Sequence, residues 1–87
     1  RPTLIDCWAT WCGPCVRMSP IIDEVAAEFG DKANIGKYNV DEESDLSQQF
    51  RIMSIPTILF FKDGKLVDRL AGSQSKATLV DKLNSML

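Results

Sequence analysis

The chain has 87 residues, of which 45% are hydrophobic and 25% charged. At about 100 to 200 residues per domain, this length predicts one domain over residues 1–87, and the composition is that of a globular chain. The net charge is −2, whereas proteins that bind the phosphate backbone usually carry an excess of positive charge, so nucleic acid is not expected as a partner. No stretch approaches the about 20 apolar residues of a membrane span, so no membrane partner is expected either.

The first half of the chain predicts a strand, a helix and a second strand. Residues 3–9 form a short apolar run, broken only by Asp6, that is typical of a buried strand. From Cys15 onward, apolar residues recur at helical spacing as far as Gly30, which we expect to end the helix in the left-handed conformation. Residues 33–40 favour a second strand, parallel to the first because a crossover helix joins the two.

The second half predicts a short helix, a β-hairpin and a final helix. The acidic run at residues 41–45 suits the first turn of a helix, and we favour this over an acid-binding or metal-binding role. Asp63-Gly64 between two apolar runs predicts a hairpin. An amphipathic helix follows, with Ser73 or Ser75 as N-cap. The order β-α-β-α-β-β-α predicts an α/β fold with a mixed four-stranded sheet flanked by three helices.

Two of the three cysteines lie in Cys12-Gly13-Pro14-Cys15, at the junction of the first strand and the first helix. A zinc site would need a second cysteine pair or histidines, but the chain has no histidine and only Cys7 besides. A purely structural disulfide explains the pair poorly, because so short a loop removes little entropy from the unfolded chain. The context instead favours a redox-active pair.

The start of a helix gives each cysteine a chemical role. Unpaired N–H groups and the helix dipole favour a thiolate there, and such settings lower the pKa of a cysteine from about 8.5 to roughly 3.5–7.5. Cys12 is therefore predicted to attack a disulfide. Cys15 lies nearly one turn further along the same face, close enough to release a mixed disulfide formed at Cys12. Pro14 suits the first turn, and Gly13 lets another chain approach closely.

The run Trp8-Ala9-Thr10-Trp11-Cys12-Gly13-Pro14-Cys15, with Ile55-Pro56-Thr57 and Gly72 downstream, closely resembles the thioredoxin family. The resemblance covers the whole chain. It implies the thioredoxin fold, reversible dithiol/disulfide exchange on disulfide-containing client proteins, and no bound cofactor. It also implies re-reduction by a thioredoxin reductase that draws electrons from NADPH, and a cytoplasmic location.

The resemblance also implies a role for each matched residue. Cys12 is the nucleophile, Cys15 the resolving thiol and Pro56 a cis-proline beside them. A cis bond there would turn the backbone of Ile55 toward Cys12, where it offers a client peptide strand-like hydrogen bonds. Trp8 is expected to pack beneath the site. The expected client-docking surface comprises Trp11, Gly13, Pro14, Ile55 and Gly72.

Asp6 is the most informative residue outside the motif, because a carboxylate in a buried strand is costly to desolvate. The alternative is an edge or solvent-facing position. Its spacing from the cysteines matches the buried acid of the family, so we expect burial to raise its pKa and Asp6 to take the proton from Cys15. Lys37 matches the lysine that accompanies this acid, with an ordinary surface position as an equal alternative. Cys7 points to the opposite face and is expected to be a small buried hydrophobe, with a regulatory thiol as the alternative.

Two features depart from the family pattern. The match begins at the family's second strand, so about 20 residues of a first strand and helix have no counterpart. Their absence should leave residues 33–40 as an open edge and uncover part of the sheet face that holds Cys7. The chain could thus be a fragment, a truncated product or a short natural form that covers the gap by dimerising. We expect a monomer, with a dimer through this sheet edge as the alternative. Val16 replaces a basic residue that is common after the second cysteine, which should raise the pKa of Cys12 slightly.

Three functions fit these observations. The first is a general cytoplasmic protein-disulfide reductase, since Gly-Pro is the pair between the cysteines of thioredoxins, which are strongly reducing at near −270 mV. The second is an exported or fused thioredoxin-like domain in a dedicated thiol-reducing or isomerase pathway. The third is a non-catalytic module that binds partners through the docking surface. The presence of both cysteines and Asp6 argues against binding alone.

Overall fold

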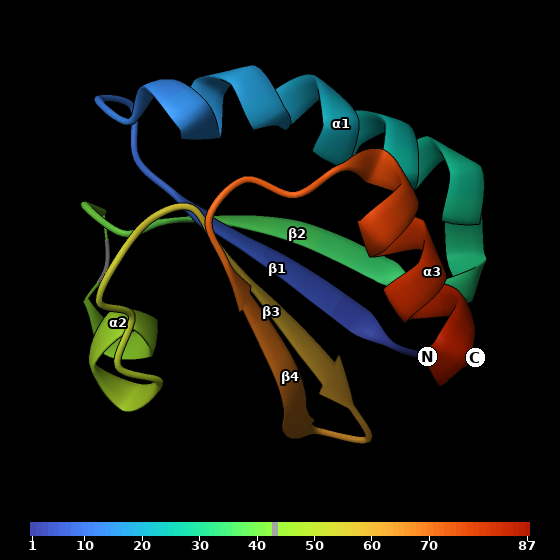
Figure 1. Ribbon diagram of the computed structural model, residues 1–87. Coiled ribbons are helices and arrows are strands. Elements are labelled where there is room, and N and C mark those ends of the chain that lie inside the picture. The colour runs from blue at the N-terminus through green and yellow to red at the C-terminus, as the bar shows by residue number, and fades with distance from the viewer. Residues whose placement is uncertain (43) are drawn as a thin grey trace.

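The computed structural model describes residues 1–42 and 44–87, in which a four-stranded sheet carries helices on both sides (Figure 1). A short 3-10 helix, η1 (Gly30–Lys32), joins the first helix to the second strand. The predicted order of strands and helices is confirmed. The elements are β1 (Thr3–Trp8), α1 (Gly13–Phe29), β2 (Asn34–Asn39), α2 (Asp45–Gln49), β3 (Thr57–Lys62), β4 (Lys65–Ala71) and α3 (Lys76–Met86).

The sheet is mixed and has the strand order β2-β1-β3-β4. β1 and β2 run parallel, as the crossover predicts, whereas β3 is antiparallel to both β1 and β4. Asp63 and Gly64 have φ values of 53° and 78°. Positive φ at both positions is what a type I′ turn requires, and the predicted hairpin is confirmed. β2 lies at one edge of the sheet, also as predicted.

The connections around α1 and α2 differ in detail from the sequence prediction. Gly30 ends α1 with a φ of 55°, but its ψ of −123° lies outside the left-handed helical region, so the chain continues into η1. Glycine tolerates this backbone because it has no Cβ. Of the acidic run, only Asp45 lies in the first turn of α2. Asp41 and Glu42 form a turn before it, and Glu43 lies outside the described residues.

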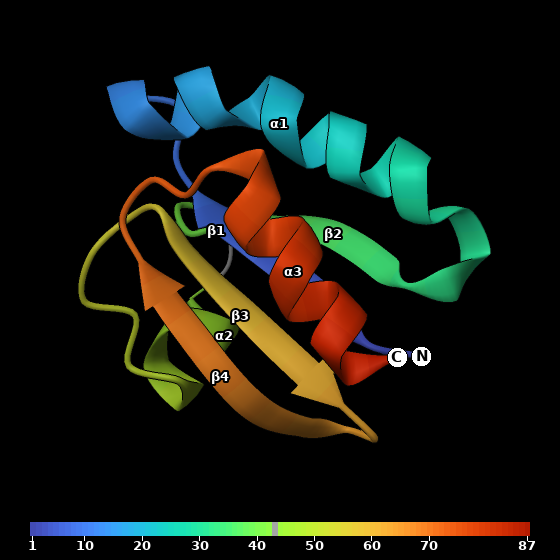
Figure 2. The same cartoon turned by 45° about the vertical axis from the view of Figure 1, so that its right-hand side comes forward.

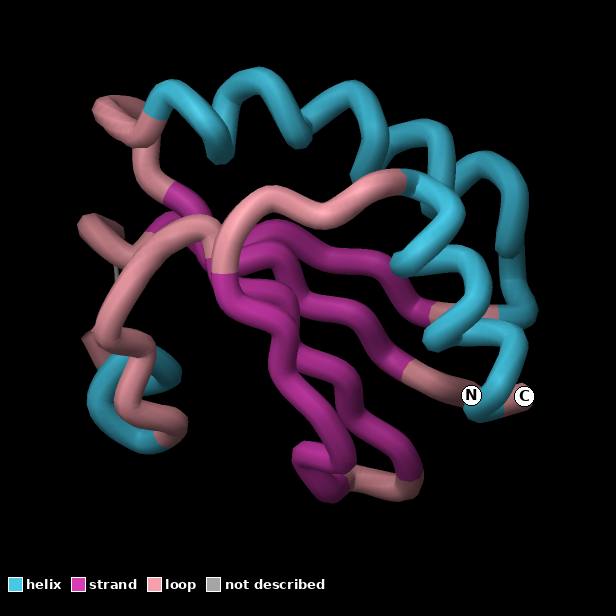
Figure 3. The backbone as a smooth tube through the Cα atoms, viewed as in Figure 1, coloured by secondary structure: helices cyan, strands magenta, loops and turns pink. Residues whose placement is uncertain are grey.

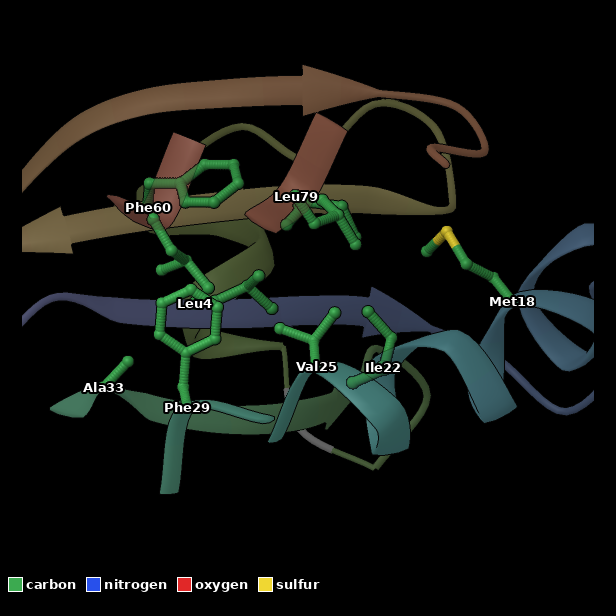
Figure 4. Packing of buried hydrophobic residues seen from close by; sticks show 10 residues of the cluster. Leu4, Met18, Ile22, Val25, Phe29, Ala33, Phe60 and Leu79 are labelled. Carbon is green, nitrogen blue, oxygen red and sulfur yellow. The ribbon is translucent and has the colours of Figure 1, made fainter. Parts of the chain in front are cut away.

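Helices α1 and α3 cover one face of the sheet, and the main core lies between them and the strands (Figures 2 and 4). Alternation along β1 turns Leu4 toward this core, and β3 contributes Ile58 and Phe60. The helical spacing that predicts α1 also predicts its buried face. The core residues from the helices are Met18, Ile22, Val25 and Phe29 of α1, and Leu79 and Leu83 of α3.

The other face of the sheet is covered only in part. Phe50, which follows α2, packs edge-on against Phe61 with ring centroids 5.3 Å apart. A hollow of about 310 Å³ remains beside them, lined among others by Ile5, Leu46 and Phe61. The expected opening of this face is therefore present, but Cys7 is fully buried. None of the described helices combines the length and apolar character that a membrane span requires.

The packing of α3 provides a test of the core. Leu83 is fully buried on α3, whereas Leu87, just beyond the helix, is 60% exposed. Leu83→Ala should lower the free energy of unfolding by about 2–5 kcal/mol, because it leaves a cavity in addition to the lost apolar contact. Leu87→Ala deletes the same atoms and should cost less than about 0.5 kcal/mol. Urea denaturation of both variants measures the difference, and equal costs would contradict this packing.

Candidate redox-active site

The cysteine pair lies in the redox loop, residues 9–15, where β1 ends and α1 begins (Figure 1). Cys12 and Cys15 form a disulfide, with their Cα atoms 5.2 Å apart. Cys12 is the N-cap of α1, so its backbone is extended while the helix starts at the next residue. Pro14 lies in the first turn, where backbone N–H groups have no partner within the helix. Its lack of an N–H therefore costs no helical hydrogen bond. The predicted placement of the pair at a helix N-terminus is confirmed.

The two sulfur atoms differ in their surroundings. The backbone N–H of Cys15 donates to the Sγ atom of Cys12 across 3.2 Å. Cys12 is 6% exposed and Cys15 1% exposed, so Cys12 is the more accessible of the two. A donated N–H and the positive end of the helix dipole both favour negative charge on Cys12 once the disulfide is reduced. This asymmetry agrees with an attacking Cys12 and a resolving Cys15.

Asp6 is buried to 1% exposure in the middle of β1, and its Oδ1 atom has no hydrogen-bond partner among the described residues. Burial raises the pKa of Asp6 to about 6, and the nearby charge of Lys37 offsets part of this increase. Alternation places Asp6 between Leu4 and Trp8 on one face. Leu4 packs in the α1 core and Trp8 packs against the cysteine pair, so Asp6 faces the first turns of α1.

Lys37 lies beside Asp6 in the parallel ladder between β1 and β2. Its ammonium group, however, donates to Oγ of Ser19 at 2.7 Å and pairs with Oδ1 of Asp23 at 2.9 Å, both on α1. The structure therefore brings Lys37 near the buried acid while directing its cation to the helix. Its effect on Asp6 is electrostatic, because it lowers the pKa that burial raises.

Cys7 is free and fully buried, as predicted for a small hydrophobe in β1. Burial raises the pKa of its thiol to about 11, and the nearby charge of Asp6 adds to the increase. A thiol with so high a pKa is protonated at neutral pH and is a poor nucleophile. The difference in reactivity between Cys7 and the redox pair thus follows from their positions in the fold.

Two further loops meet the redox loop (Figure 3). The Ile55–Pro56 bond is cis, as predicted, and Ile55 packs against the cluster of Ala9, Cys12 and Cys15. The carbonyl of Pro56 accepts a hydrogen bond from the N–H of Gly72 at 2.8 Å, which joins the loop before β3 to the loop after β4. Gly72 has a φ of 84°, a conformation that favours glycine.

Trp11 is 69% exposed, and its indole Nε1 donates to Oδ2 of Asp41 across 2.7 Å. Beside it lies a hollow of about 460 Å³ that also includes Ile55 in its lining. Sequence reasoning did not assign the remaining lining residues, although three of them directly precede Ile55 in the chain. Met53 among them is 91% exposed. These remaining residues are Val40, Ser47, Ile52, Met53 and Ser54.

Comparison with known proteins agrees with this geometry. The family model for thioredoxin matches residues 1–85. The chain belongs to the thioredoxin family. Thioredoxin 1 of Synechococcus elongatus is 43% identical over 86 residues, which cover 99% of this chain and 80% of that protein. The thioredoxin of Staphylococcus saprophyticus is 45% identical over 84 residues, which cover 97% of this chain and 81% of the relative.

A solved structure confirms the thioredoxin fold. A mutant thioredoxin from Halobacterium salinarum superposes with a TM-score of 0.90 at 32% identity, and the match covers 98% of this chain and 74% of the other. Thioredoxins are thiol–disulfide oxidoreductases that bind no cofactor themselves, and the chain carries their Cys-X-X-Cys pair as a disulfide. The resemblance, the fold class and the oxidoreductase activity expected from the sequence are all confirmed.

The raised pKa of Asp6 gives the free energy of unfolding a distinctive pH dependence. The carboxyl loses its proton near pH 6 in the folded chain, against an ordinary value of 3.8. Since the folded state holds this proton more tightly, the ionised carboxylate destabilises the fold above pH 6. The shift from 3.8 to about 6 corresponds to about 3 kcal/mol. This penalty fades as the pH falls through 6 and is absent below about pH 4.

Asp6→Asn should therefore be more stable than the parent chain at pH 8, by up to about 3 kcal/mol. The advantage should shrink steadily between pH 6 and pH 4. Denaturant unfolding at a series of pH values measures both chains. Asp81→Asn, which removes a carboxylate from the exposed side of α3, controls for the change in net charge. A difference that stays constant with pH would contradict the raised pKa.

Proposed function

We propose that this chain is a general protein-disulfide reductase of a reducing compartment, the cytoplasm, and that a thioredoxin reductase restores its dithiol with electrons from NADPH. The observation that carries the proposal is the Cys12 sulfur at the N-cap of α1, which accepts the N–H of Cys15 beside the exposed Trp11. A sulfur in that setting is a stabilised anion when reduced, and so a good nucleophile and leaving group.

The proposed reaction has two exchange steps. The Cys12 thiolate attacks one sulfur of a client disulfide, forms a mixed disulfide with it and expels the other client sulfur as a thiolate. Cys15, deprotonated by Asp6, then attacks the Cys12 sulfur, which re-forms the Cys12–Cys15 disulfide and expels the second client thiolate. Two electrons pass to the client, and the proton of Cys15 passes to Asp6.

The client segment is proposed to lie extended over the redox loop. The backbone of Ile55, held next to the cysteine pair, offers it strand-like hydrogen bonds. Gly72 presents no side chain that would block a close approach, and Gly13, Pro14 and Trp11 complete the contact surface. The hollow beside Trp11 and Met53 is proposed to take an apolar client side chain, for which the flexible thioether of methionine is well suited.

We further propose that the chain acts as a monomer. All residues of the proposed site come from one chain, and no second copy is needed to complete it. β2 is an edge strand that could pair with another copy, but Asn34 and Lys37 are exposed on it, and a charged side chain on an edge opposes such pairing. Dimerisation through this edge is the alternative that sedimentation would reveal.

An insulin-reduction assay coupled to NADPH oxidation by a thioredoxin reductase tests the proposed function. The chain should sustain turnover, and Cys12→Ser should abolish it because the attacking sulfur is lost. Cys15→Ser should instead accumulate a covalent client adduct at Cys12 that dithiothreitol releases. Cys7→Ala is the matched control, since it removes a cysteine outside the site and should leave turnover intact. Full turnover by Cys12→Ser, or no adduct with Cys15→Ser, would refute the assigned roles.

The role of Asp6 predicts which of the two steps depends on it. Asp6→Asn should slow the resolving step by roughly 10²-fold, the lower part of the range for general acid–base catalysis, and change the first attack little. In the parent chain the resolving rate should rise with pH near 6, as Asp6 loses its proton. Stopped-flow kinetics separate the two phases. Equal slowing of both, or an unchanged pH profile in the variant, would count against a base at this position.

A further inference from the structure

Arg17 places a cation beside the redox loop. Side chains on a helix lean toward its N-terminus, so a residue lies over the one four positions earlier, which here is Gly13. A Cβ atom on Gly13 would lie 3.2 Å from the Nη1 atom of Arg17, so the guanidinium rests directly over this glycine. Among residues 1–42 and 44–87, no carboxylate forms an ion pair with it.

The opposite charge lies beside the residue that precedes Cys12 in the chain. Trp11, which precedes Cys12, is bonded to the carboxylate of Asp41, and Asp41 and Glu42 are both exposed. Gly13, which follows Cys12, carries the guanidinium of Arg17. The connection between β2 and α2 therefore holds a negative charge beside Trp11, and the first turns of α1 hold a positive charge beside Gly13, so the two residues next to Cys12 in the chain carry opposite charges.

One hollow lies beside Trp11 and another beside Arg17. The hollow on the Trp11 side has a volume of about 460 Å³ and an apolar lining. The one on the Arg17 side has about 200 Å³ and lies between the start of α1 and the loop after β4, with Pro14, Met18 and Gln74 in its lining. A cation is thus available at the smaller hollow. Although Val16 lacks the expected charge, Arg17 supplies one at the next position.

We propose that Arg17 selects clients that carry an acidic side chain on one side of the reacting half-cystine. In an extended segment, the side chains two residues before and after the half-cystine point to the same face as it does, each about 6.6 Å away along the strand. One of them meets Arg17, whose planar guanidinium binds carboxylates in a two-pronged manner, and the other meets the carboxylate of Asp41. The proposal rests on the proposed function, because it requires a half-cystine presented to Cys12.

The test uses the reduced Cys15→Ser variant and three capped peptides supplied as symmetric disulfides. Their sequences are Glu-Gly-Cys-Gly-Gln, Gln-Gly-Cys-Gly-Glu and the neutral Gln-Gly-Cys-Gly-Gln. Attack by Cys12 breaks the peptide disulfide, joins one peptide to Cys12 and releases the other as a thiolate. Acid quenching and intact-mass measurement give the rate of adduct formation. The ionic strength is kept near 10 mM, where the Debye length is about 30 Å, so charges within the site are little screened from one another.

One of the two acidic peptides should react about two- to fivefold faster than the neutral peptide, which is the range that exposed ion pairs give. The other should react no faster than the neutral peptide, because it meets Asp41. This acceleration is expected despite the net charge of −2, which by itself would slow the reaction of acidic peptides. Arg17→Gln should abolish it, whereas Lys65→Gln, at the remote β3–β4 hairpin, should retain it.

Normalising each rate to that of the neutral peptide removes any effect of Arg17 on the reactivity of Cys12 itself, since such an effect scales all three rates equally. Two outcomes overturn the proposal: neither acidic peptide exceeds the neutral one, or the acceleration survives Arg17→Gln. Failure of every peptide to form an adduct would instead overturn the proposed function, and this inference with it.

Discussion

The hydrogen bond from the N–H of Cys15 to the sulfur of Cys12 connects the fold of this chain to its chemistry. The first N–H groups of a helix have no partner within the helix, and most helices satisfy one of them with the oxygen of a serine, threonine, asparagine or aspartate. Here the cap is a sulfur. The same N–H group of Cys15 therefore caps α1 and stabilises the thiolate of Cys12. The core residues that hold α1 on the sheet also keep this N–H directed at the sulfur.

The fold stabilises the negative charge of one group in this region and destabilises that of two others. The helix N-terminus favours an anion at Cys12, whereas burial disfavours the anion of Asp6 and that of Cys7. Lys37 moderates the cost at Asp6 without pairing with it, because its ammonium group is held by Ser19 and Asp23 on α1. A carboxyl with a pKa of about 6 is partly protonated near neutral pH, so it can both accept and return a proton during a reversible exchange.

Features that depend on nearby residues were predictable from the sequence alone, and some distant features were expected through the family resemblance. Contacts between distant side chains outside the family motif were not predictable. The cysteine pair at the start of α1 and the Asp-Gly turn follow from spacing and turn chemistry, whereas the burial of Asp6 and the cis bond before Pro56 were expected from the resemblance to the thioredoxin family. The bond between Trp11 and Asp41 joins residues 30 positions apart, and the exposure of Met53 depends on how a loop folds over the sheet. The position of Arg17 over Gly13 follows helical spacing, but only the structure shows that its guanidinium lacks a carboxylate partner among the residues described.

The strand order itself assembles the site. Cys7 of β1 pairs with Thr57 of β3, and Thr57 pairs with Ala71 of β4, so these residues form one row across the sheet. The redox loop leaves this row from β1, the cis-proline loop enters it at β3, and Gly72 follows it from β4. Because neighbouring strands lie about 4.8 Å apart, the three loops must meet at this end of the sheet. A slip of one residue between β1 and β3 would turn the core face of a strand to the other side, so the apolar pattern that fixes the register also fixes the site.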